Sequence, residues 1–279
     1  MNSNHTLPIA FQRLYSYQAF KNNKDYHMHD CFELFFLLEG DLNYYIGQSL
    51  YHVTSSSIIT INPHEPHKCV NNKDDRFERI YFHIPFSFIE KYSTPDINLT
   101  DCFTDRPVGK NNILLLSQLQ KQHIVNIYNK MNEIKESTRY SYGNSLLFDT
   151  YVLQLLIYIN DLFYSNPFAA PDKYSDEVRF ITEYIDAHIT DNITLDILAD
   201  KLSLNKYYLS HKFKHETDTT ILQYLILARI SKAKQFLSNG MNVTETCYNT
   251  GFNDYSNFIT TFKKVTGYTP KKYQQSFRI

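Results

Sequence analysis

Tryptophan is absent from this chain of 279 residues, and cysteine occurs only four times. The cysteines form no Cys-x-x-Cys pair, so the sequence predicts reduced thiols in a cytoplasmic protein. Long apolar runs are also missing, because the longest, Leu34–Leu38 and Ile113–Leu116, are far too short to cross a bilayer. The first eleven residues lack a basic start followed by an apolar stretch, so we expect no secretory signal.

A strong net charge is missing as well. The value of −1 by itself argues against a nucleic-acid-binding protein. However, residues 1–173 carry 15 Lys and Arg against 18 Asp and Glu, whereas residues 174–279 carry 13 against 11. The cations that follow Tyr255 have no acidic residue among them. Phosphates sense charge within about 10 Å at moderate salt, so the C-terminal part suits nucleic acid, with a solvated lysine-rich tail as the alternative.

The N-terminal third of the chain predicts a small β-rich domain. Strand-like runs at Glu33–Leu38, Leu42–Ile46, Ser57–Ile61 and Phe77–Ile84 are separated by turn residues at short spacing. Several short strands in this arrangement are typical of a sandwich or a small barrel. Because the rest of the chain reads as helices, the expected fold class is α+β with two domains.

Helical periodicity replaces the strand pattern in the middle of the chain. It predicts two helices, Ile113–Ile134 and Leu146–Phe163, followed by a proline-containing linker. From Asp176 onward the chain reads as helices only. We therefore expect a sensing domain at residues 1–108, a helical region at 109–166, a linker at 167–175 and a helical domain at 176–279.

A spaced self-similarity marks the last third of the chain. Residues 213–224 recur at 262–273 with an offset of 49, because Phe, Lys, two Thr and Tyr occupy equivalent positions. Between the copies, residues 220–237 predict one helix of about 27 Å. A duplicated helical unit on such a spacer can place two docking helices about one DNA turn, roughly 34 Å, apart. A helical protein-interaction module is the alternative.

Each copy predicts a helix-turn-helix unit whose second helix has an apolar and a polar face. Thr194, Asn205 and Asp254 are expected helix caps, and Gly251 is expected to end a helix. The polar faces offer donors and cations suited to bases and phosphates. The predicted DNA-binding residues are Lys206, Tyr207, Ser210, His211 and Lys214 in the first copy and Tyr255, Asn257, Thr260 and Lys264 in the second.

Residues 242–273 closely resemble the signature of AraC/XylS-type transcription regulators. The matching positions are Gly251-Phe252, Asp254, Phe258, Phe262-Lys263, Gly267, Thr269-Pro270 and Tyr273. The resemblance covers about residues 180–278 and implies seven helices with two helix-turn-helix units, whose polar faces lie against DNA. His211 and Thr260 stand where many members have arginine, Asp218 replaces the usual glycine, and Cys247 replaces a usual alanine. Threonine suits contact with a thymine methyl group rather than with guanine.

A second strong pattern is His27-x-His29-x3-Glu33-x6-Gly40, followed later by His67. Alternate strand residues share a face, and three histidines with one carboxylate form a plausible set for a divalent metal. The pattern resembles the paired motifs of cupin β-barrels, which AraC-type regulators often place before their DNA-binding domain. In such regulators the histidines often persist without metal, so we expect no cofactor. A metal site at His27, His29, Glu33 and His67 is the alternative.

Aromatic side chains on the same strands predict a small-molecule pocket. The expected ligand-binding residues are His27, His29, Glu33, Phe35, Tyr45, His67 and Tyr81. Tyrosines and acids suit a sugar, although the lack of tryptophan weakens that interpretation. Cys31 and Cys69 lie near the ends of the motif, so a redox response is an alternative, with buried inert thiols as the simpler explanation.

These patterns together predict a cytoplasmic, ligand-responsive transcription regulator without enzymatic activity. Activation is the commoner outcome in the family. The expected partners are double-stranded promoter DNA, a small-molecule effector, a second copy bound through the middle helices, and RNA polymerase if the protein is an activator; no membrane is expected. Simple packing of the middle helices against the barrel is the alternative to dimerisation. A metal- or redox-sensing regulator and a metal-dependent cupin enzyme are the alternative functions.

Overall fold

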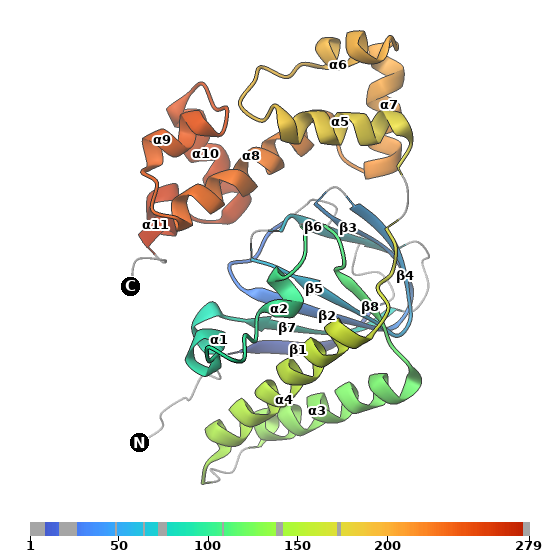
Figure 1. Cartoon of the computed structure of the whole chain (residues 1–279), viewed down its shortest axis with the longest axis vertical. Helices are drawn as coiled ribbons and strands as arrows, with labels where there is room; N and C mark the ends of the chain where they lie inside the picture. The colour runs from blue at the N-terminus through green and yellow to red at the C-terminus, as the bar shows by residue number, and fades with distance from the viewer. Residues whose placement is uncertain are drawn as a thin grey trace.

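A computed structural model describes residues 9–16, 27–47, 49–63, 65–71, 77–107, 109–137, 142–171 and 174–275. A β-rich N-terminal domain carries two long helices on one side and an all-helical C-terminal domain on the other (Figure 1). The α+β class expected from the sequence is confirmed. Parts of the predicted linker and of the basic C-terminal tail lie outside the described residues.

Two antiparallel sheets form the N-terminal domain. The larger has the order β1 (Ala10–Ser16), β7 (Phe77–Ile84), β2 (Phe32–Glu39), β5 (Ser57–Ile61) and β8 (Ile113–Leu115). The smaller has the order β4 (Ser49–Thr54), β3 (Asp41–Ile46) and β6 (His67–Asn71). Side chains alternate along each strand, so Leu34 and Phe36 lie on one face of the larger sheet while Glu33 and Phe35 lie on the other. The second face looks into the space between the sheets.

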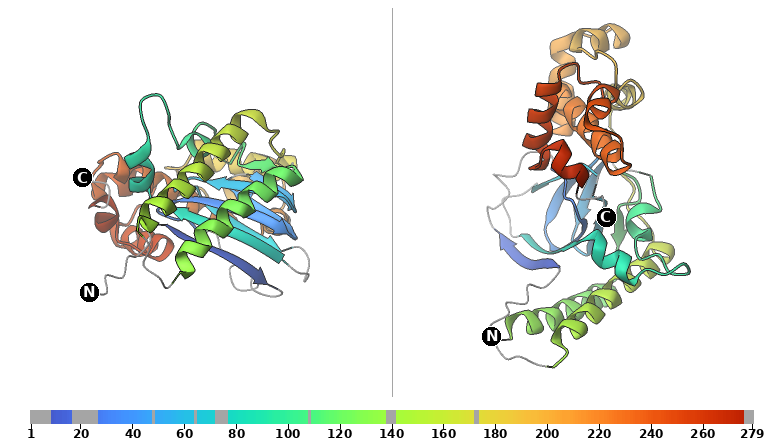
Figure 2. Two further views of the ribbon diagram at one scale, coloured as in Figure 1. Left: turned by 90° about the horizontal axis from the view of Figure 1, so that it is seen from below. Right: turned by 90° about the vertical axis from the view of Figure 1, so that its left-hand side faces the viewer.

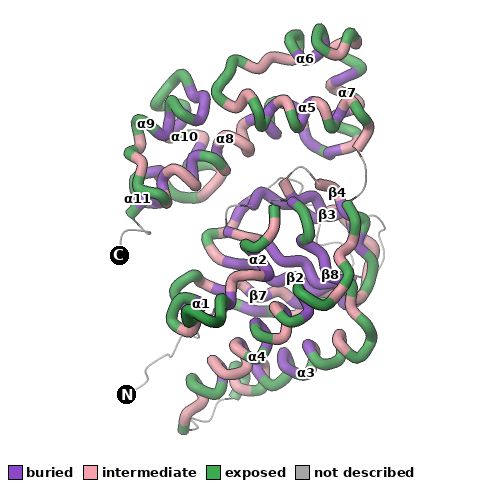
Figure 3. The backbone as a smooth tube through the Cα atoms, in the orientation of Figure 1, coloured by how far each residue is buried: buried purple, intermediate pink, exposed green. Residues whose placement is uncertain are grey.

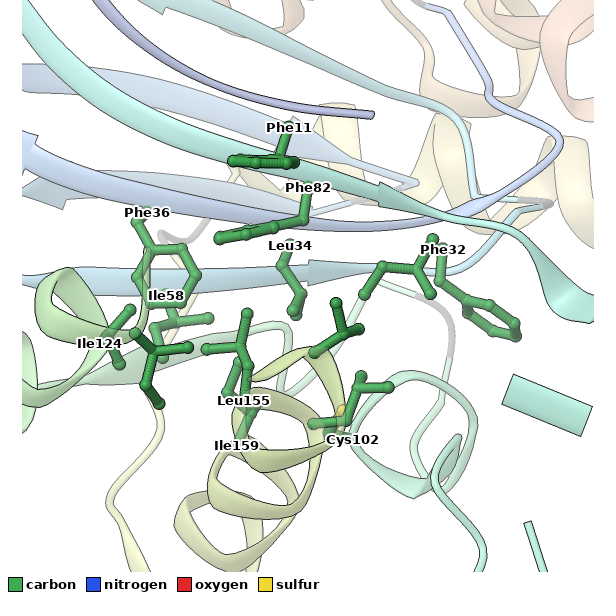
Figure 4. Packing of buried hydrophobic residues seen from close by; sticks show 14 of the residues in the cluster. Phe11, Phe32, Leu34, Phe36, Ile58, Phe82, Cys102, Ile124, Leu155 and Ile159 are labelled. Carbon is green, nitrogen blue, oxygen red and sulfur yellow. The ribbon is translucent and has the colours of Figure 1, made fainter. Parts of the chain in front are cut away.

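The outer face of the larger sheet is covered by helices. These are α3 (Gln118–Glu136) and α4 (Asn144–Ser165), together with the short α1 (Phe86–Tyr92) and α2 (Asp101–Thr104). Figure 2 shows α3 and α4 side by side across the strands. Figure 4 shows the resulting core, in which Phe11, Phe36 and Phe82 of the sheet lie toward Leu155 and Ile159 of α4. Burying these large side chains supplies the main stabilisation of the domain, at roughly 1.5–3 kcal/mol each.

The predicted helix Ile113–Ile134 is wrong at its start. Residues 113–115 form β8, which pairs with β5 so that Ile113 faces Ile59, while Leu119 is 84% exposed. The helix begins only after Ser117, whose side chain and that of Gln120 form a reciprocal capping box. Residues 109–166 are therefore not a separate helical region, because their strand completes the sheet and their helices share its core.

Helix α4 is the one helix among the described residues that has the length and composition to cross a membrane, with 22 residues and a mean hydropathy of 1.3. Phe148, Val152, Leu155 and Ile159 form a fully buried stripe against the sheet. A core helix passes the same test of length and composition, so this feature is weak evidence for a membrane span.

The C-terminal domain has seven helices in its described part and two separate cores. The helices are α5 (Asp176–Ala187), α6 (Leu195–Leu202), α7 (Lys206–Thr217), α8 (Ile221–Ser238), α9 (Val243–Asn249), α10 (Tyr255–Thr266) and α11 (Pro270–Gln275). The first core joins α5, α6, α7 and the start of α8, and the second joins the rest of α8 with α9, α10 and α11. Figure 3 shows the purple buried segments of each group turned inward. Helix α8 thus connects two units, as the repeat predicted.

Candidate DNA-binding surface and sensor pocket

Helix α7 presents the predicted DNA-binding residues of the first unit. Asn205 caps it by accepting from the backbone N–H of Tyr207 at 2.8 Å, and Leu209 and Phe213 anchor it in the core. The opposite face is open to solvent, where Tyr207 is 71% exposed. The predicted residues Lys206 and Ser210 are partly exposed, and His211 and Lys214 are exposed.

Helix α10 repeats this arrangement in the second unit. Asp254 caps it by accepting from the N–H of Asn257 at 2.6 Å, and Phe258 and Phe262 are fully buried. All four predicted residues, Tyr255, Asn257, Thr260 and Lys264, are exposed. The hydroxyl of Thr260 donates to the carbonyl of Ser256 at 2.9 Å, which leaves its methyl group for apolar contact. The expected caps at Thr194, Asn205 and Asp254 are confirmed.

A cavity of about 220 Å³ lies between the two sheets of the N-terminal domain. Five of the predicted ligand-binding residues line it, namely His27, His29, Glu33, Phe35 and Tyr81. Leu14, Tyr44, Cys69, Arg79 and His83 complete the lining. Its walls therefore combine aromatic rings with one carboxylate, one guanidinium and several imidazoles.

Glu33 is the centre of a cluster of histidines. Its Oε2 atom lies 3.0 Å from Nε2 of His29, 3.3 Å from Nε2 of His67 and 3.6 Å from Nε2 of His83. Glu33 Oε2 and His67 Nε2 are both buried, yet neither has a partner in hydrogen-bond geometry within the described residues. Buried polar atoms that converge without hydrogen bonds are rare and point to a bound group.

The backbone fixes the orientation of His67. Its Nδ1 lies 3.0 Å from the carbonyl oxygen of Glu65, so Nδ1–H donates there and Nε2 is directed at Glu33. Glu65 is itself held by Arg106 at 2.7 Å and by Asn112 at 3.0 Å. Metal-binding histidines are commonly oriented by such a carbonyl contact.

Burial and the imidazoles act in opposite directions on the carboxylate of Glu33. Burial by itself raises the pKa of Glu33, but the close imidazoles of His29, His67 and His83 outweigh it and hold that pKa well below its usual value. For His67, burial lowers the pKa, but the carboxylate of Glu33 outweighs burial and raises it. The cluster therefore favours the charged forms of both groups.

The residues of the cluster fit a divalent metal. Two overlapping sets, His27 with His29 and His67, and His29 with Glu33 and His83, each keep their ligand atoms within 4.8 Å of one another. An ion about 2.1 Å from each ligand allows separations of up to about 4.2 Å, so small side-chain movements suffice. Imidazole nitrogens with one carboxylate suit zinc, nickel, copper or iron.

The predicted ligand-binding residue Tyr45 does not line this cavity. Strand β3 turns Tyr44 toward the cavity, where its ring stacks on His67 at 6.2 Å, and turns Tyr45 to the opposite face. There Lys68 lies 4.7 Å above the ring of Tyr45. The sequence contained both tyrosines but no signal for their register, which is set by pairing with β6.

Two further lining residues, Arg79 and His83, were not predicted. Both lie on β7, two residues on either side of Tyr81, which was expected to face the interior. Because alternate strand residues share a face, that expectation for Tyr81 already implied the same side for Arg79 and His83.

The thiols near the cavity are poorly suited to redox sensing. Burial raises the pKa of Cys31 to about 12, and burial also raises the pKa of Cys69. The thiolate is the reactive form, and little of it is present at neutral pH. All four cysteines are free thiols.

Two family models match the chain. One, described as a helix-turn-helix domain, matches residues 198–276, and the other, described as an AraC-like ligand binding domain, matches residues 13–120. The first contains both α7 and α10, and the second contains the whole of the two sheets except the start of β1.

Two relatives with partial identity to this chain are named as transcriptional regulators. An HTH-type transcriptional regulator from the cgkA 5′ region of Pseudoalteromonas carrageenovora is 39% identical over 94 residues, which cover 34% of this chain and 56% of that protein. The HTH-type transcriptional regulator YbfI of Bacillus subtilis (strain 168) is 24% identical over 234 residues, which cover 82% of this chain and 79% of YbfI. The chain thus spans just over half of the first relative.

Among solved structures, ToxT from Vibrio cholerae O395 aligns with 16% sequence identity and a TM-score of 0.39. The alignment covers 97% of this chain and 98% of ToxT.

Proposed function

Since this chain belongs to the AraC/XylS-type transcription regulators, we propose that α7 and α10 bind successive stretches of promoter DNA under the control of a small molecule in the sensor pocket. One observation carries the proposal. Two capped helices with exposed polar faces are joined by the 18-residue α8, in the same chain as a pocket with a charged centre. At about 1.5 Å per residue, α8 is about 27 Å long, so it separates the two helices by a distance comparable to one DNA turn, roughly 34 Å.

The effector of this proposal is a small polar molecule, for which a single sugar is one candidate. The cavity of about 220 Å³ is below the usual range for drug-sized ligands, about 300–1,000 Å³. The rings of Tyr44 and Tyr81 suit stacking on a sugar face, and Glu33 suits its hydroxyl groups. A larger cavity of about 310 Å³ lies between the domains, but charged and buried groups converge in the smaller one.

The proposed setting is a cytoplasmic homodimer that activates transcription through RNA polymerase. Helix α4 exposes Leu146, Ile157 and Tyr164, which are spaced by 11 and 7 residues and so share one face. Exposed apolar stripes of this kind mark interaction surfaces. A second copy of the chain fits this surface, because a twofold assembly would bring the same stripe of both copies together.

The contribution of phosphate contacts is tested by Lys264→Ala. Lys264 is exposed near the end of α10. Its loss should weaken binding to all DNA sequences alike and reduce the salt slope by about 1. The measurement is a titration of the upstream promoter fragment at several salt concentrations. The matched control is Lys130→Ala, because Lys130 is an exposed lysine on α3, outside the helix-turn-helix units. A slope equal to that of wild type would exclude a phosphate contact at this position.

Base reading in the first unit is tested by Tyr207→Ala. If Tyr207 contacts base edges, its removal should change the preference between promoter and random DNA by about 1–3 kcal/mol. Competition gel shifts measure this preference directly. Equal losses on promoter and random DNA would count against base readout by α7.

Metal sensing at the histidine cluster is the second candidate function. It is favoured by the convergence of the buried Glu33 Oε2 and His67 Nε2 atoms, neither of which has a partner in hydrogen-bond geometry within the described residues, and by the carbonyl that orients His67. A bound ion would take the place of the imidazole proton of His67 and supply positive charge to the carboxylate of Glu33. Because the relatives are named as transcriptional regulators, we propose a regulatory role and no enzymatic activity.

A further inference from the structure

Two lysines are fully buried in the described part of the chain, and each binds across the boundary between the two domains. Lys68, in β6, donates from Nζ to the carbonyl oxygens of Thr217 and Asp218 at 3.2 and 2.9 Å. It also lies 2.9 Å from the carboxylate of Asp218. These acceptors are the C-terminal end of α7, where carbonyl groups lack helical partners and a cation is stabilising.

Lys234, in α8, makes the second contact between the domains. Its Nζ donates to the carboxylate of Asp30 at 3.0 Å and to the carbonyl of Pro63 at 3.2 Å. Met28, two residues before Asp30, is buried in the core cluster of the second unit, to which Tyr273 also belongs. The sensor domain therefore contacts the first unit through Lys68 and the second unit through Asp30 and Met28.

The two charged sensor residues in these contacts, Lys68 and Asp30, are each the chain neighbour of a cluster histidine. His67 precedes Lys68, and His29 precedes Asp30. The two segments are also joined to each other, because the N–H groups of His27 and His67 each donate to the other's carbonyl at 3.0 Å. A change in the spacing of the histidines therefore moves both contact residues.

We propose that these two contacts, Lys68–Asp218 and Lys234–Asp30, form a brace that sets the position of α7 relative to α10. In this proposal, the occupant of the histidine cluster changes DNA affinity by shifting the brace. The inference deepens the proposed function and rests on it for the link to DNA. The brace holds the C-terminal end of α7, whereas recognition helices contact bases mainly through their N-terminal residues, here Tyr207 and Ser210. The braced form and DNA therefore do not compete for the same side chains.

The brace also gives the effector a discrete structural target. A buried cation is costly without a partner, and both lysines lose partners when the domains separate. The docked and separated arrangements are therefore distinct states. An effector shifts the balance between them only through its different affinity for each state.

The first test measures amide hydrogen exchange in the full-length chain. Lys68→Met with Lys234→Met should speed exchange in the last turn of α7 and in α8 by about tenfold, because local opening becomes easier. The matched control is Lys121→Met, since Lys121 binds the carbonyl of Leu38 within the sensor domain. Equal exchange in the brace and control variants would overturn the brace.

Partly exposed partners provide a second set of variants if the buried ones fail to fold. The side chains of Asp30 and Asp218 are 36% and 45% exposed, so Asp30→Asn and Asp218→Asn weaken the same contacts with little effect on packing. They should speed exchange in the same segments by about threefold or more. Unchanged exchange in the folded aspartate variants would also overturn the proposal.

Coupling between the cluster and the brace is tested by a double-mutant cycle. His29→Gln should change exchange at the end of α7 when Lys68 is present, and should have no such effect in Lys68→Met. Strictly additive effects would overturn the coupling. This arm needs no knowledge of the effector.

The link to DNA is tested on the upstream promoter fragment with full-length protein. The brace variants should change affinity by about fivefold or more relative to Lys121→Met. Tighter binding means that the brace restrains the two helices, and weaker binding means that it aligns them; affinity equal to the control overturns the link. If wild-type protein binds no promoter DNA, the proposed function fails, while the exchange experiments still decide the brace.

Discussion

The carboxylate of Glu33 lies 3.3 Å from Nε2 of His67 in the interior of the sensor domain, where both side chains are almost completely buried. The two residues come from different sheets, Glu33 from β2 and His67 from β6. Their contact therefore ties the sheets together at the same point where a ligand or an ion would bind.

The contact between Glu33 and His67 predicts a pH window for the stability that it contributes. Because the pKa of His67 is raised on folding, the charged imidazole contributes its full stabilisation of the folded state below about pH 6.5. That stabilisation is lost as the pH rises through the folded-state pKa of His67. Because the pKa of Glu33 is lowered on folding, the charged carboxylate stabilises the folded state above about pH 4.5. That stabilisation is lost as the pH falls through the folded-state pKa of Glu33. Glu33→Gln should therefore lower the free energy of unfolding most, by about 2 kcal/mol, between pH 4.5 and 6.5.

Urea unfolding at a series of pH values measures this window. Glu78→Gln is the matched control, because Glu78 is a buried carboxylate paired with Arg13, whose charge does not change in this range. A loss of stability in Glu33→Gln that is the same at pH 5.5 and pH 9 would contradict the predicted role of His67.

His83 is expected to contribute to metal binding if the cluster holds an ion. His83→Gln should weaken zinc or nickel binding by about tenfold or more, because one imidazole ligand of the His29–Glu33–His83 set is lost. Isothermal titration of metal-free protein measures the affinity. His52→Gln is the control, since His52 pairs with Asp41 outside the cavity. Equal affinities in the two variants would remove His83 from the site.

Gly251 is expected to be essential for joining the two helical units. Its φ is +80°, and an added Cβ would clash with the carbonyl oxygen of Ile189 and lie 2.9 Å from Nε of Arg229. Arg229 itself donates to that carbonyl at 2.9 Å, so it has little freedom to move. Gly251→Ala should therefore cost about 3 kcal/mol or more, as backbone strain and a steric clash combine.

Gly240 offers a matched control for this substitution. Its φ is +89°, but an added Cβ would meet no atom within 4 Å. Gly240→Ala should therefore show only the strain of the left-handed backbone, about 1 kcal/mol. Thermal unfolding measures the decrease in Tm of each variant. Equal decreases would show that the clash with the carbonyl of Ile189 does not contribute to the loss of stability.

Dimerisation through α4 is tested at Ile157, which is 55% exposed in the middle of the apolar stripe. Ile157→Lys should convert a dimer into a monomer in sedimentation experiments, because a charge placed in an apolar interface loses its hydration. Leu222→Lys is the control, as Leu222 is 65% exposed on α8 of the other domain. Dimers of undiminished stability in Ile157→Lys would place the interface elsewhere.

The helix-turn-helix units were predictable because their signals are local. Asn205 and Asp254 cap the helices that they immediately precede, and Phe213 and Phe262 lie at helical spacing from their neighbours in the cores. Each signal operates within a few residues, so no knowledge of distant contacts was needed.

The β-rich domain was less predictable because strand pairing is non-local. Ile113 lies in an apolar run that suits a helix, but in the structure it extends the edge of the sheet by pairing with Ile59 of β5. Tyr44 and Tyr45 are adjacent and chemically identical, and only the register with β6 decides which one faces the cavity. A shift of one residue exchanges the two faces of a strand.

Local spacing in the sequence by itself determined the two capped recognition helices, the helix between them and the His27, His29 and Glu33 motif. Only the tertiary structure decided that His83 joins this motif and that Lys68 and Lys234 bind across the domain boundary. Lys68 and Thr217, which are joined by a hydrogen bond, are 149 positions apart in the chain. The sequence around either residue does not predict this contact, because the contact depends on how two domains with separate hydrophobic cores pack against each other.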